Sequence, residues 1–327
     1  MVWFYIALVV ILILLLICLI LAISIHNKYF SNRFVADSLT RYYTKDEFGL
    51  SEHVVSFSCN KRKLKGAFYS KNIEYPNNLI IFCHGMWSSR KAYMQDIAYY
   101  CQNGFEVFSY DAYGVDESEG NSIVGLGMGL KALDSAINYV KSIDAYKDKN
   151  IIVIGHSWGG FCALNIVKYH PNIKKVIALA PFISINQVLK GMLPKKLGFM
   201  AYFITIIDFF KCGFYSLENA KKNLKKYNGD AYIIHSLDDN MVNYNLNTGL
   251  LKKNLPNYSN ILIETVNNKI HNPQYTENAV KLLNEYLAKL HSLDLTKQKE
   301  LKSQTNFHDL GELDLDIMDK IEKFILK

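Results

Sequence analysis

One turn constrains the fold of this chain more than any other stretch, and it reads IIVIGHSWGG over residues 151–160. Its four branched aliphatic residues form a short, uninterrupted apolar run, which predicts a strand buried on both faces of a parallel sheet. The glycines begin where this run stops, and the following FCALNIVKYH is compatible with a helix. The stretch therefore predicts a strand that turns sharply into a helix.

Short apolar runs of the same kind recur along the chain, and longer amphipathic segments separate them. Gly, Asp, Ser or Asn stands at or just after the end of each run, as in LIIFCHG, EVFSYDAYG, KVIALAPFIS, AYIIHSLDD and NILIETVNN. Between two of these runs, residues 126–143 carry apolar residues at helical spacing. Strands that alternate with helices predict an α/β fold with a mostly parallel sheet and helices on both faces. An earlier segment, HVVSFSCNKRKLKGAFYSK, predicts two strands around a turn.

The N-terminal residues differ from the rest of the chain. No charged residue occurs from Val2 to Ile25, and a helix of this length spans about 36 Å, enough to cross a hydrocarbon core of about 30 Å. A cleaved signal peptide is the alternative, but its apolar segment is shorter and follows a basic residue. We therefore expect one retained transmembrane helix.

Basic residues follow this apolar run and none precedes it. They are Lys28, Arg33, Arg41 and Lys45. The excess of positive charge on this side predicts that the rest of the chain lies in the cytoplasm. The net charge of the whole chain is +7, but the basic residues are thinly spread, so we expect no nucleic-acid partner. Six cysteines occur without a C-x-x-C pair, which favours free thiols.

The alternation of strands and helices is interrupted at about residues 182–226. This region contains LGFMAYFITIIDFFKCGFY and no clear strand, so we interpret it as a helical cap inserted over the strand ends; one long core helix with its loops is the alternative. The predicted organisation is a transmembrane helix over 1–25, a juxtamembrane linker over 26–50 and one α/β domain over 51–327. At the C-terminus, LDLDIMDKIEKFILK has one apolar helical face and predicts a helix that packs on the sheet.

Gly155, Ser157 and Gly159 form the pattern G-x-S-x-G, which is typical of a turn that exposes a nucleophilic serine above a sheet. A serine hydroxyl needs a base, and the base needs a carboxylate that orients it. His271 follows the last apolar run and is the best candidate for the base. The preceding run ends in Asp238 and Asp239, and both remain candidates for the acid.

Five motifs in the expected order, GHSWGG, HGMW, DAYGVDES, HSLDDNMV and IHNP, resemble the α/β-hydrolase fold in its serine aminopeptidase-like and monoacylglycerol lipase-like branch. The resemblance covers about Val54 to Lys327. It implies that the acid is Asp239, three residues before Val242, with Asp238 as the alternative because Ser236 replaces the usual glycine.

The resemblance also implies an oxyanion hole, in which two backbone N–H groups stabilise the charge that develops on the substrate oxygen. One donor is Trp158, the residue after the nucleophile, and the other is Met86 in HGMW. Asp111 and Ser118 in DAYGVDES are expected to hold their loop and to have no catalytic role.

These features together predict a membrane-anchored serine hydrolase that cleaves an ester, thioester or amide through an acyl-enzyme intermediate. The reaction requires no metal and no organic cofactor, and the substrate is a small molecule or a lipid-like acyl compound. Three alternatives stay open: an acyltransferase with the same triad, a peptidase, and a non-catalytic binding protein on the same fold. A peptidase of this branch would need acidic groups near the cap to hold a substrate amine, and the cap offers only Asp208 and Glu218.

Overall fold

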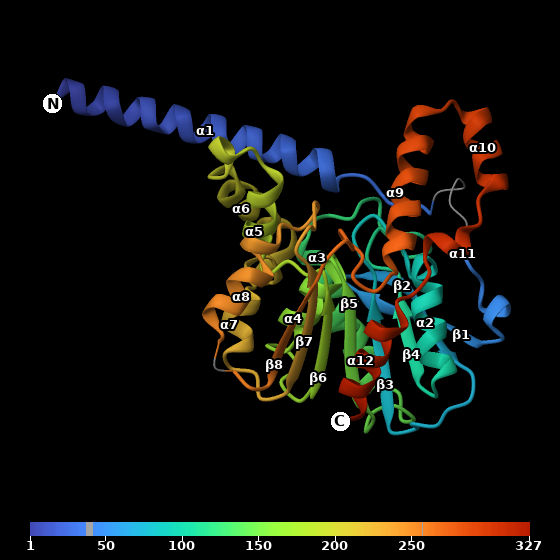
Figure 1. The fold of residues 1–327 in the computed structure, drawn as a ribbon. Helices are drawn as coiled ribbons and strands as arrows, with labels where there is room; N and C mark the ends of the chain where they lie inside the picture. The colour runs from blue at the N-terminus through green and yellow to red at the C-terminus, as the bar shows by residue number, and fades with distance from the viewer. Residues whose placement is uncertain (37–41, 257) are drawn as a thin grey trace.

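An eight-stranded sheet forms the centre of the protein in the computed structural model, which describes residues 1–36, 42–256 and 258–327 (Figure 1). The strand order is β1-β2-β4-β3-β5-β6-β7-β8. The strands are β1 (Ser51–Cys59), β2 (Arg62–Ser70), β3 (Asn78–Cys83), β4 (Glu106–Tyr110), β5 (Asn150–His156), β6 (Lys175–Leu179), β7 (Asp230–Ser236) and β8 (Ile261–Val266). β2 pairs antiparallel with both β1 and β4, and the remaining neighbours pair in parallel. This confirms the predicted mostly parallel sheet.

The first two strands form the predicted hairpin. The turn between them places Asn60 at φ 48° and Lys61 at φ 65°. Two consecutive residues with positive φ are typical of the two-residue hairpin turn whose twist matches that of the flanking strands. Asparagine tolerates this backbone region better than most residues, so the local sequence favours the turn.

Helices cover both faces of the sheet. α3 (Gly127–Lys141) and α4 (Trp158–Ile166) pack on one face, together with strand residues such as Leu79, Ile81 and Val153. α2 (Met94–Gln102) and α12 (Leu315–Leu326) pack on the other face, together with Ile80 and Ile154. Successive residues of one strand thus face opposite sides, and both sides are apolar, which is why these strands appear in the sequence as unbroken apolar runs.

The C-terminal region follows the last strand with four helices: α9 (Glu277–Ser292), α10 (Leu295–Gln304), α11 (Phe307–Leu310) and α12. Ile317, Met318, Ile321 and Ile325 of α12 are buried against the sheet. This confirms the prediction that the terminal apolar face docks on the domain.

The segment between β6 and β7 contains α5 (Ile185–Met192), α6 (Met200–Cys212) and α7 (Ala220–Leu224), with short 3-10 turns at Lys195–Leu197 and Gly213–Leu217. It is therefore a group of separate helices and not one long core helix. α5 and α6 lie beyond the end of the sheet, close to α1 (Figure 1). A further short helix, α8 (Thr248–Asn254), separates β7 from β8.

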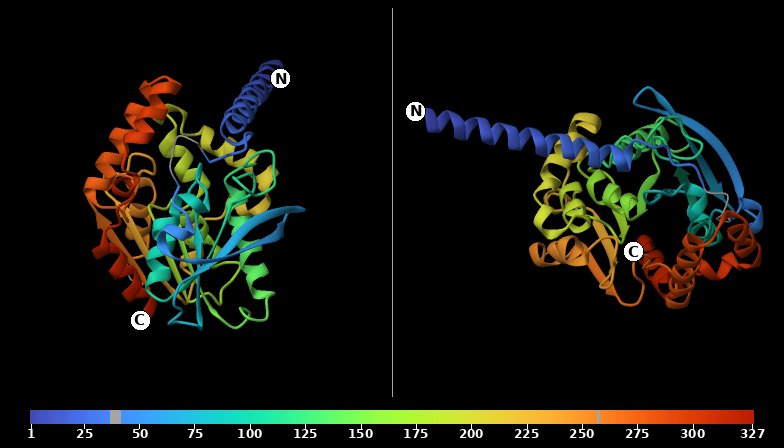
Figure 2. Two further views of the ribbon diagram at one scale, coloured as in Figure 1. Left: turned by 90° about the vertical axis from the view of Figure 1, so that its right-hand side faces the viewer. Right: turned by 90° about the horizontal axis from the view of Figure 1, so that it is seen from above.

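The N-terminal helix α1 (Val2–Phe30) projects away from the sheet and packs along α6 near its own C-terminal end (Figure 2). Its length and composition are those of a helix that can cross a membrane. The segment Met200–Leu224 passes the same test, but nearly half of it is buried inside the protein.

The helix α1 extends beyond the predicted span. The helix does not end at Ile25 but continues to Phe30, because the residues after the charge-free run dock on the domain. Beyond the helix, the backbone N–H of Phe34 donates to the Gly114 carbonyl at 3.0 Å, and the N–H of Asp116 donates to the Phe34 carbonyl at 2.8 Å. Residues 26–34 are thus attached to the domain, while Arg41 of the predicted linker lies outside the described residues.

Candidate active site

Ser157 occupies the turn between β5 and α4 at φ 56° and ψ −111°. This backbone region is costly for any residue other than glycine, and such strain is concentrated at functional sites. The two flanking glycines are required because a side chain at either position would clash with the backbone. A Cβ at Gly155 would lie 2.2 Å from the Gly159 carbonyl oxygen, and a Cβ at Gly159 would lie 2.1 Å from the Cys83 carbonyl oxygen. The sequence motif therefore adopts the expected sharp turn.

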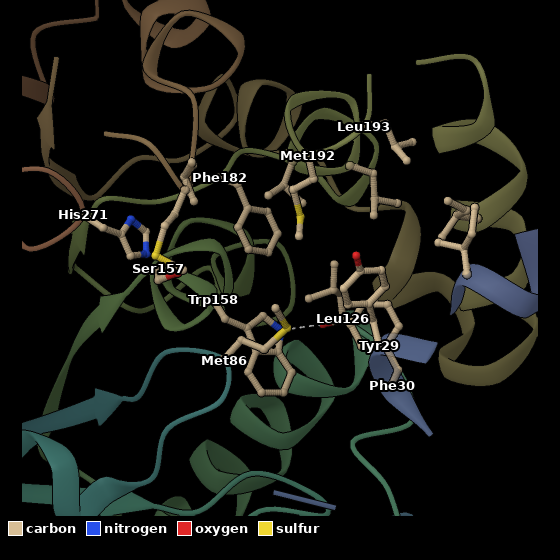
Figure 3. Close-up of a pocket in the computed structure, with 16 residues that line it drawn as sticks. Tyr29, Phe30, Met86, Leu126, Ser157, Trp158, Phe182, Met192, Leu193 and His271 are labelled. Carbon is tan, nitrogen blue, oxygen red and sulfur yellow. Dashed lines mark hydrogen bonds between the residues drawn. The ribbon is translucent and has the colours of Figure 1, made fainter. Parts of the chain in front are cut away.

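Ser157 and His271 line one cavity at the carboxyl end of the parallel strands, and their side chains lie side by side there (Figure 3). His271 follows β8 in a turn with two positive φ angles, 59° at Asn268 and 46° at Ile270. Its Nδ1 lies 2.8 Å from Oδ2 of Asp239, which follows β7. The structure thus brings together the serine, the histidine and an aspartate that the sequence nominates.

Asp239 is held as a buried carboxylate. Burial by itself would raise its pKa, but hydrogen bonds from His235 and His271 outweigh that effect and hold the pKa well below its usual value. The backbone N–H groups of Met241 and Val242 both donate to Oδ1 at 2.8 Å. A carboxylate with this many donors stays ionised and fixes the ring that it contacts.

The neighbouring Asp238 points elsewhere. It is exposed, and its carboxylate accepts a hydrogen bond from the hydroxyl of Ser236. Ser236 stands where the family resemblance leads us to expect glycine, and its hydroxyl oxygen also lies 3.3 Å from the Val266 carbonyl oxygen. Ser236 thus contacts Asp238, while Asp239 is the aspartate that contacts His271.

Met86 and Trp158, the two expected backbone donors, line the same cavity as Ser157. Met86 lies in the loop after β3, and Trp158 begins α4, so its N–H belongs to the unpaired first turn of a helix. Within residues 1–36, 42–256 and 258–327, neither N–H donates to a protein acceptor. The Trp158 indole donates to the Leu126 carbonyl at 2.8 Å, which fixes the side chain below the cavity (Figure 3).

A network of buried side chains holds the loop that carries Met86. The N–H of Ala112 donates to Nε2 of His84 at 3.0 Å, so the opposite ring nitrogen carries the proton and donates to the Gly85 carbonyl at 2.7 Å. The N–H of Gly85 donates to the Tyr93 hydroxyl at 3.0 Å, and that hydroxyl lies 2.7 Å from Nδ1 of His156. Burial lowers the pKa of His84 to about 4, so this ring is neutral at physiological pH.

Asp111 and Ser118 hold the adjacent loop, as the sequence predicts. Oδ1 of Asp111 accepts the backbone N–H of Arg90 at 2.9 Å, and the Ser118 hydroxyl donates to the Asp111 carbonyl at 2.6 Å. Both residues are fully buried. Neither lines the cavity that contains Ser157.

The walls of the cavity are apolar. Its volume is about 770 Å³, including the open mouth. Besides Ser157 and His271, it is lined by Ile25, Tyr29 and Phe30 of α1, by Val188, Leu189, Met192, Leu193 and Ile204 of the cap, and by Met86, Leu126, Trp158, Phe182, Met241 and Val242. The contribution of α1 is the part that sequence reasoning missed. The aromatic pair Tyr29 and Phe30, four residues beyond the apolar run, was the available signal.

No group of three or more His, Cys, Asp or Glu side chains is placed to hold a metal ion among the residues that the structure describes.

The sheet topology and the serine turn after β5 define an α/β-hydrolase. A family model described as serine aminopeptidase, S33, matches residues 74–249, which is more than half of the chain, and the chain belongs to this family. Comparison with curated proteins finds no match.

Several solved structures share the fold at low sequence identity. The esterase Pf2001 of Pyrococcus furiosus is 18% identical with a TM-score of 0.57, and the alignment covers 80% of this chain and 96% of the esterase. Est1E from Butyrivibrio proteoclasticus, solved with ferulic acid bound, is 18% identical with a TM-score of 0.52, covering 73% of this chain and 100% of Est1E. The acylaminoacyl peptidase of Pyrococcus horikoshii is 16% identical with a TM-score of 0.51, covering 73% of this chain and 41% of the peptidase.

Proposed function

We propose that this protein is a membrane-anchored serine hydrolase that cleaves an ester or thioester of an apolar acyl group through an acyl-enzyme intermediate. One observation carries the proposal: Ser157, in a strained turn, lines the same cavity as His271, whose Nδ1 contacts a buried carboxylate at 2.8 Å. This arrangement of nucleophile, base and orienting acid is the one that activates a serine hydroxyl.

The proposed reaction begins with attack of the Ser157 hydroxyl oxygen on the acyl carbonyl carbon. Nε2 of His271 takes the hydroxyl proton, and Asp239 stabilises the resulting imidazolium. The backbone N–H groups of Met86 and Trp158 donate to the oxygen that becomes negative; one such donor is typically worth about 3 to 4 kcal/mol in the transition state. His271 then returns the proton to the leaving group, and water attacks the acyl-enzyme by the reverse sequence of proton transfers.

The surroundings of the cap carboxylates favour an acyl ester over an aminoacyl substrate. Asp208 is buried and accepts the backbone N–H groups of Leu126 and Gly127 at 2.7 and 3.0 Å. Glu218 is buried and accepts the Tyr169 hydroxyl at 2.8 Å and also binds Lys168. Both carboxylates are thus engaged inside the protein, and no acidic side chain is found among the described residues that line the cavity. A substrate amine has no partner there.

The proposed anchor is α1. Its residues from Val2 to Leu21 are exposed apart from the half-buried Cys18, and a helix of this length spans about 30 Å, the thickness of a hydrocarbon core. Lys28 and Arg33 follow this exposed part, so the positive-inside rule places the hydrolase domain in the cytoplasm.

Labelling with a fluorophosphonate probe tests the proposal on the full chain in detergent. We expect labelling of the wild-type protein and of the exposed-serine control Ser142→Ala, and none of Ser157→Ala. If the folded wild-type protein is not labelled at any pH, it is a binding protein and not a serine hydrolase. Turnover of p-nitrophenyl esters, compared with aminoacyl amides, then distinguishes an esterase from a peptidase. Transfer of the acyl group to an added alcohol in preference to water would instead identify an acyltransferase.

A further inference from the structure

We propose that the last two turns of α1 form a wall of the acyl-binding cavity and select the acyl chain, so that the proposed anchor is also part of the active site. The substrate is then an ester whose acyl chain enters the cavity from the membrane surface. This inference rests on the proposed function, because it names the substrate class of the same site.

One face of α1 lines the cavity. Ile25 and Tyr29 are four residues apart and therefore lie on one side of the helix. Together with Phe30 they line the cavity that contains Ser157, and Figure 3 shows Tyr29 and Phe30 at the opposite end of this cavity from His271. Phe30 is buried, Ile25 is half-buried and Tyr29 is 41% exposed. The wall thus runs from the core to the solvent-accessible mouth.

Buried polar contacts fix this wall against the cap. His26 is fully buried, and its Nε2 lies 3.4 Å from Oδ2 of Asp208 on α6. Nζ of Lys211 donates to Nδ1 of His26 at 3.2 Å and to Oδ1 of Asn27 at 2.8 Å. Since burying such polar groups without partners is costly, the contacts define one position of α1 relative to α6.

A backbone hydrogen bond attaches the end of the helix to the domain as well. The N–H of Val124 donates to the carbonyl of Phe30 at 3.1 Å. Val124 lies directly before the loop that leads into α3. The end of α1 is thereby held to both the cap and the domain below it, so its side chains form a lasting part of the cavity.

The position of the wall along α1 places it at the membrane surface. The part of the helix without a buried residue ends at Leu21, and Ile25 follows about 6 Å further along the axis. A helix whose first 20 or so residues fill the hydrocarbon core therefore holds Ile25 and Tyr29 at the level of the lipid headgroups. Tyrosine is enriched at this depth because its ring is apolar and its hydroxyl is polar.

The cap offers a second apolar surface beside α1. The exposed side of α6 and its flanks carries Phe199, Tyr202, Ile206, Phe210 and Phe214. Exposed apolar patches of this kind mark interaction sites, and the packing of α6 along α1 places this one next to the proposed membrane span.

Met192 of the cap and Tyr29 of α1 are both exposed and both line the cavity, so its mouth lies between α1 and the cap. An acyl chain can pass from the membrane to Ser157 between α1 and the cap.

Substitution of Ile25 tests the inference, with Ile23 as the matched control. Both residues are isoleucine on the same part of α1, but Ile23 is exposed and does not line the cavity. We expect Ile25→Trp to lower the ratio of kcat/KM for p-nitrophenyl dodecanoate to kcat/KM for p-nitrophenyl acetate at least about tenfold, because a single apolar group in a pocket discriminates substrates by 10- to 200-fold. Ile25→Ala should shift the preferred ester to a longer chain. Ile23→Trp and Ile23→Ala should change neither value.

A second measurement does not depend on catalysis. In the Ser157→Ala background, 11-(dansylamino)undecanoic acid should bind in detergent, and Ile25→Trp should weaken its binding while Ile23→Trp does not. If esters are hydrolysed but the Ile25 and Ile23 variants behave alike in both assays, the inference is wrong and the proposed function stands. If no ester is hydrolysed but the probe binds and depends on Ile25, the wall is present and the proposed function fails. If Ile25→Trp lowers the thermal midpoint, the Ile25→Ala variant tests the inference instead. Its expected shift is toward longer acyl chains, which a loss of stability would not produce.

Discussion

Nε2 of His156 lies 2.7 Å from the backbone carbonyl oxygen of His271. A carbonyl only accepts, so this nitrogen carries the proton, and Nδ1 of His156 is the acceptor for the Tyr93 hydroxyl at 2.7 Å. Burial, followed by the nearby His271, lowers the pKa of His156 to about 3, so the ring is neutral above pH 4. One neutral chain of hydrogen bonds therefore connects Gly85, beside the proposed oxyanion donor, to the backbone of the proposed base.

The first prediction concerns this chain. His156→Ala leaves the His271 carbonyl and the Tyr93 hydroxyl without their partner, and a small displacement of a catalytic group costs up to about 100-fold in rate. We expect a ten- to hundredfold loss of kcat/KM on a p-nitrophenyl ester. His156→Gln, whose amide nitrogen can donate to the same carbonyl, should recover part of that loss.

The pH dependence distinguishes positioning from proton transfer. Because His156 is already neutral in the folded protein, its replacement should leave the midpoint of the acid limb of the pH–rate profile in place. A shifted midpoint would mean that His156 itself exchanges protons with the substrate. A thermal midpoint that collapses in both variants would instead assign the residue to folding alone.

The second prediction separates the two adjacent aspartates. Asp239→Asn replaces the acceptor of His271 with an amide and favours the wrong ring tautomer, a change that costs about 10⁴-fold in kcat in a serine protease with the same arrangement. We expect a loss of about 10³-fold or more here, and a change of less than about threefold for Asp238→Asn, whose side chain is exposed and contacts Ser236. Equal losses in the two variants would contradict the assignment of Asp239. Steady-state kinetics with one soluble ester provides the comparison.

The sheet and the serine turn were predictable because their causes are local. Four aliphatic residues followed by G-x-S-x-G specify a buried strand and a turn that only small neighbours allow, and both occur at Ser157. The position of His271 followed from chain order, since the carboxyl ends of β7 and β8 meet at one edge of the sheet. The choice between Asp238 and Asp239 was open because it depends on which way each residue of a turn points.

Contacts between distant segments could not be predicted from the sequence. His26 meets Asp208, 182 residues away, and His156 meets Tyr93, 63 residues away. No local sequence pattern predicts either contact, because each depends on how α6 and α2 pack against the rest of the fold. The same reason explains why the end of α1 was predicted to be a linker, although its residues form part of the cavity.

The third prediction compares two truncations of α1. The sequence alone predicts that the span ends at Ile25, and in the structure Ala22 is the first buried residue of the helix. A chain of residues 22–327 keeps Ile25, Tyr29, Phe30 and the contact between His26 and Asp208. We expect it to be soluble and to hydrolyse a soluble ester within about threefold of the full chain, because the whole cavity remains.

A chain of residues 31–327 provides the contrast. It lacks the α1 wall and exposes the apolar side of α6 that this wall covered, so we expect a lower thermal midpoint and at least a tenfold loss on long-chain esters. Equal activity of the two truncated chains on esters of every length would show that α1 contributes nothing to the site. A folded but inactive 22–327 chain would show that the exposed part of the helix does more than anchor.

The fourth prediction concerns the stability of the domain. Asp96 on α2 is 1% exposed, and neither of its carboxylate oxygens has a hydrogen-bond partner among the described residues. Burial raises its pKa from 3.8 to about 7. The folded protein thus binds this proton more tightly than the unfolded chain, and the contribution of Asp96 to the free energy of unfolding falls as the pH rises from about 4 to about 7, by at most about 4 kcal/mol.

Asp96→Asn removes the titrating group and keeps its shape. As the pH rises from about 4.5 to about 8, the free energy of unfolding of the variant should therefore increase relative to that of the wild-type protein. Above that range the difference should stay constant. Urea unfolding of both proteins across this range measures the difference. Asp144→Asn is the control, because its side chain is 97% exposed. Stability curves of Asp96→Asn and wild type that run parallel with pH would show that the Asp96 carboxylate is solvated in the folded protein.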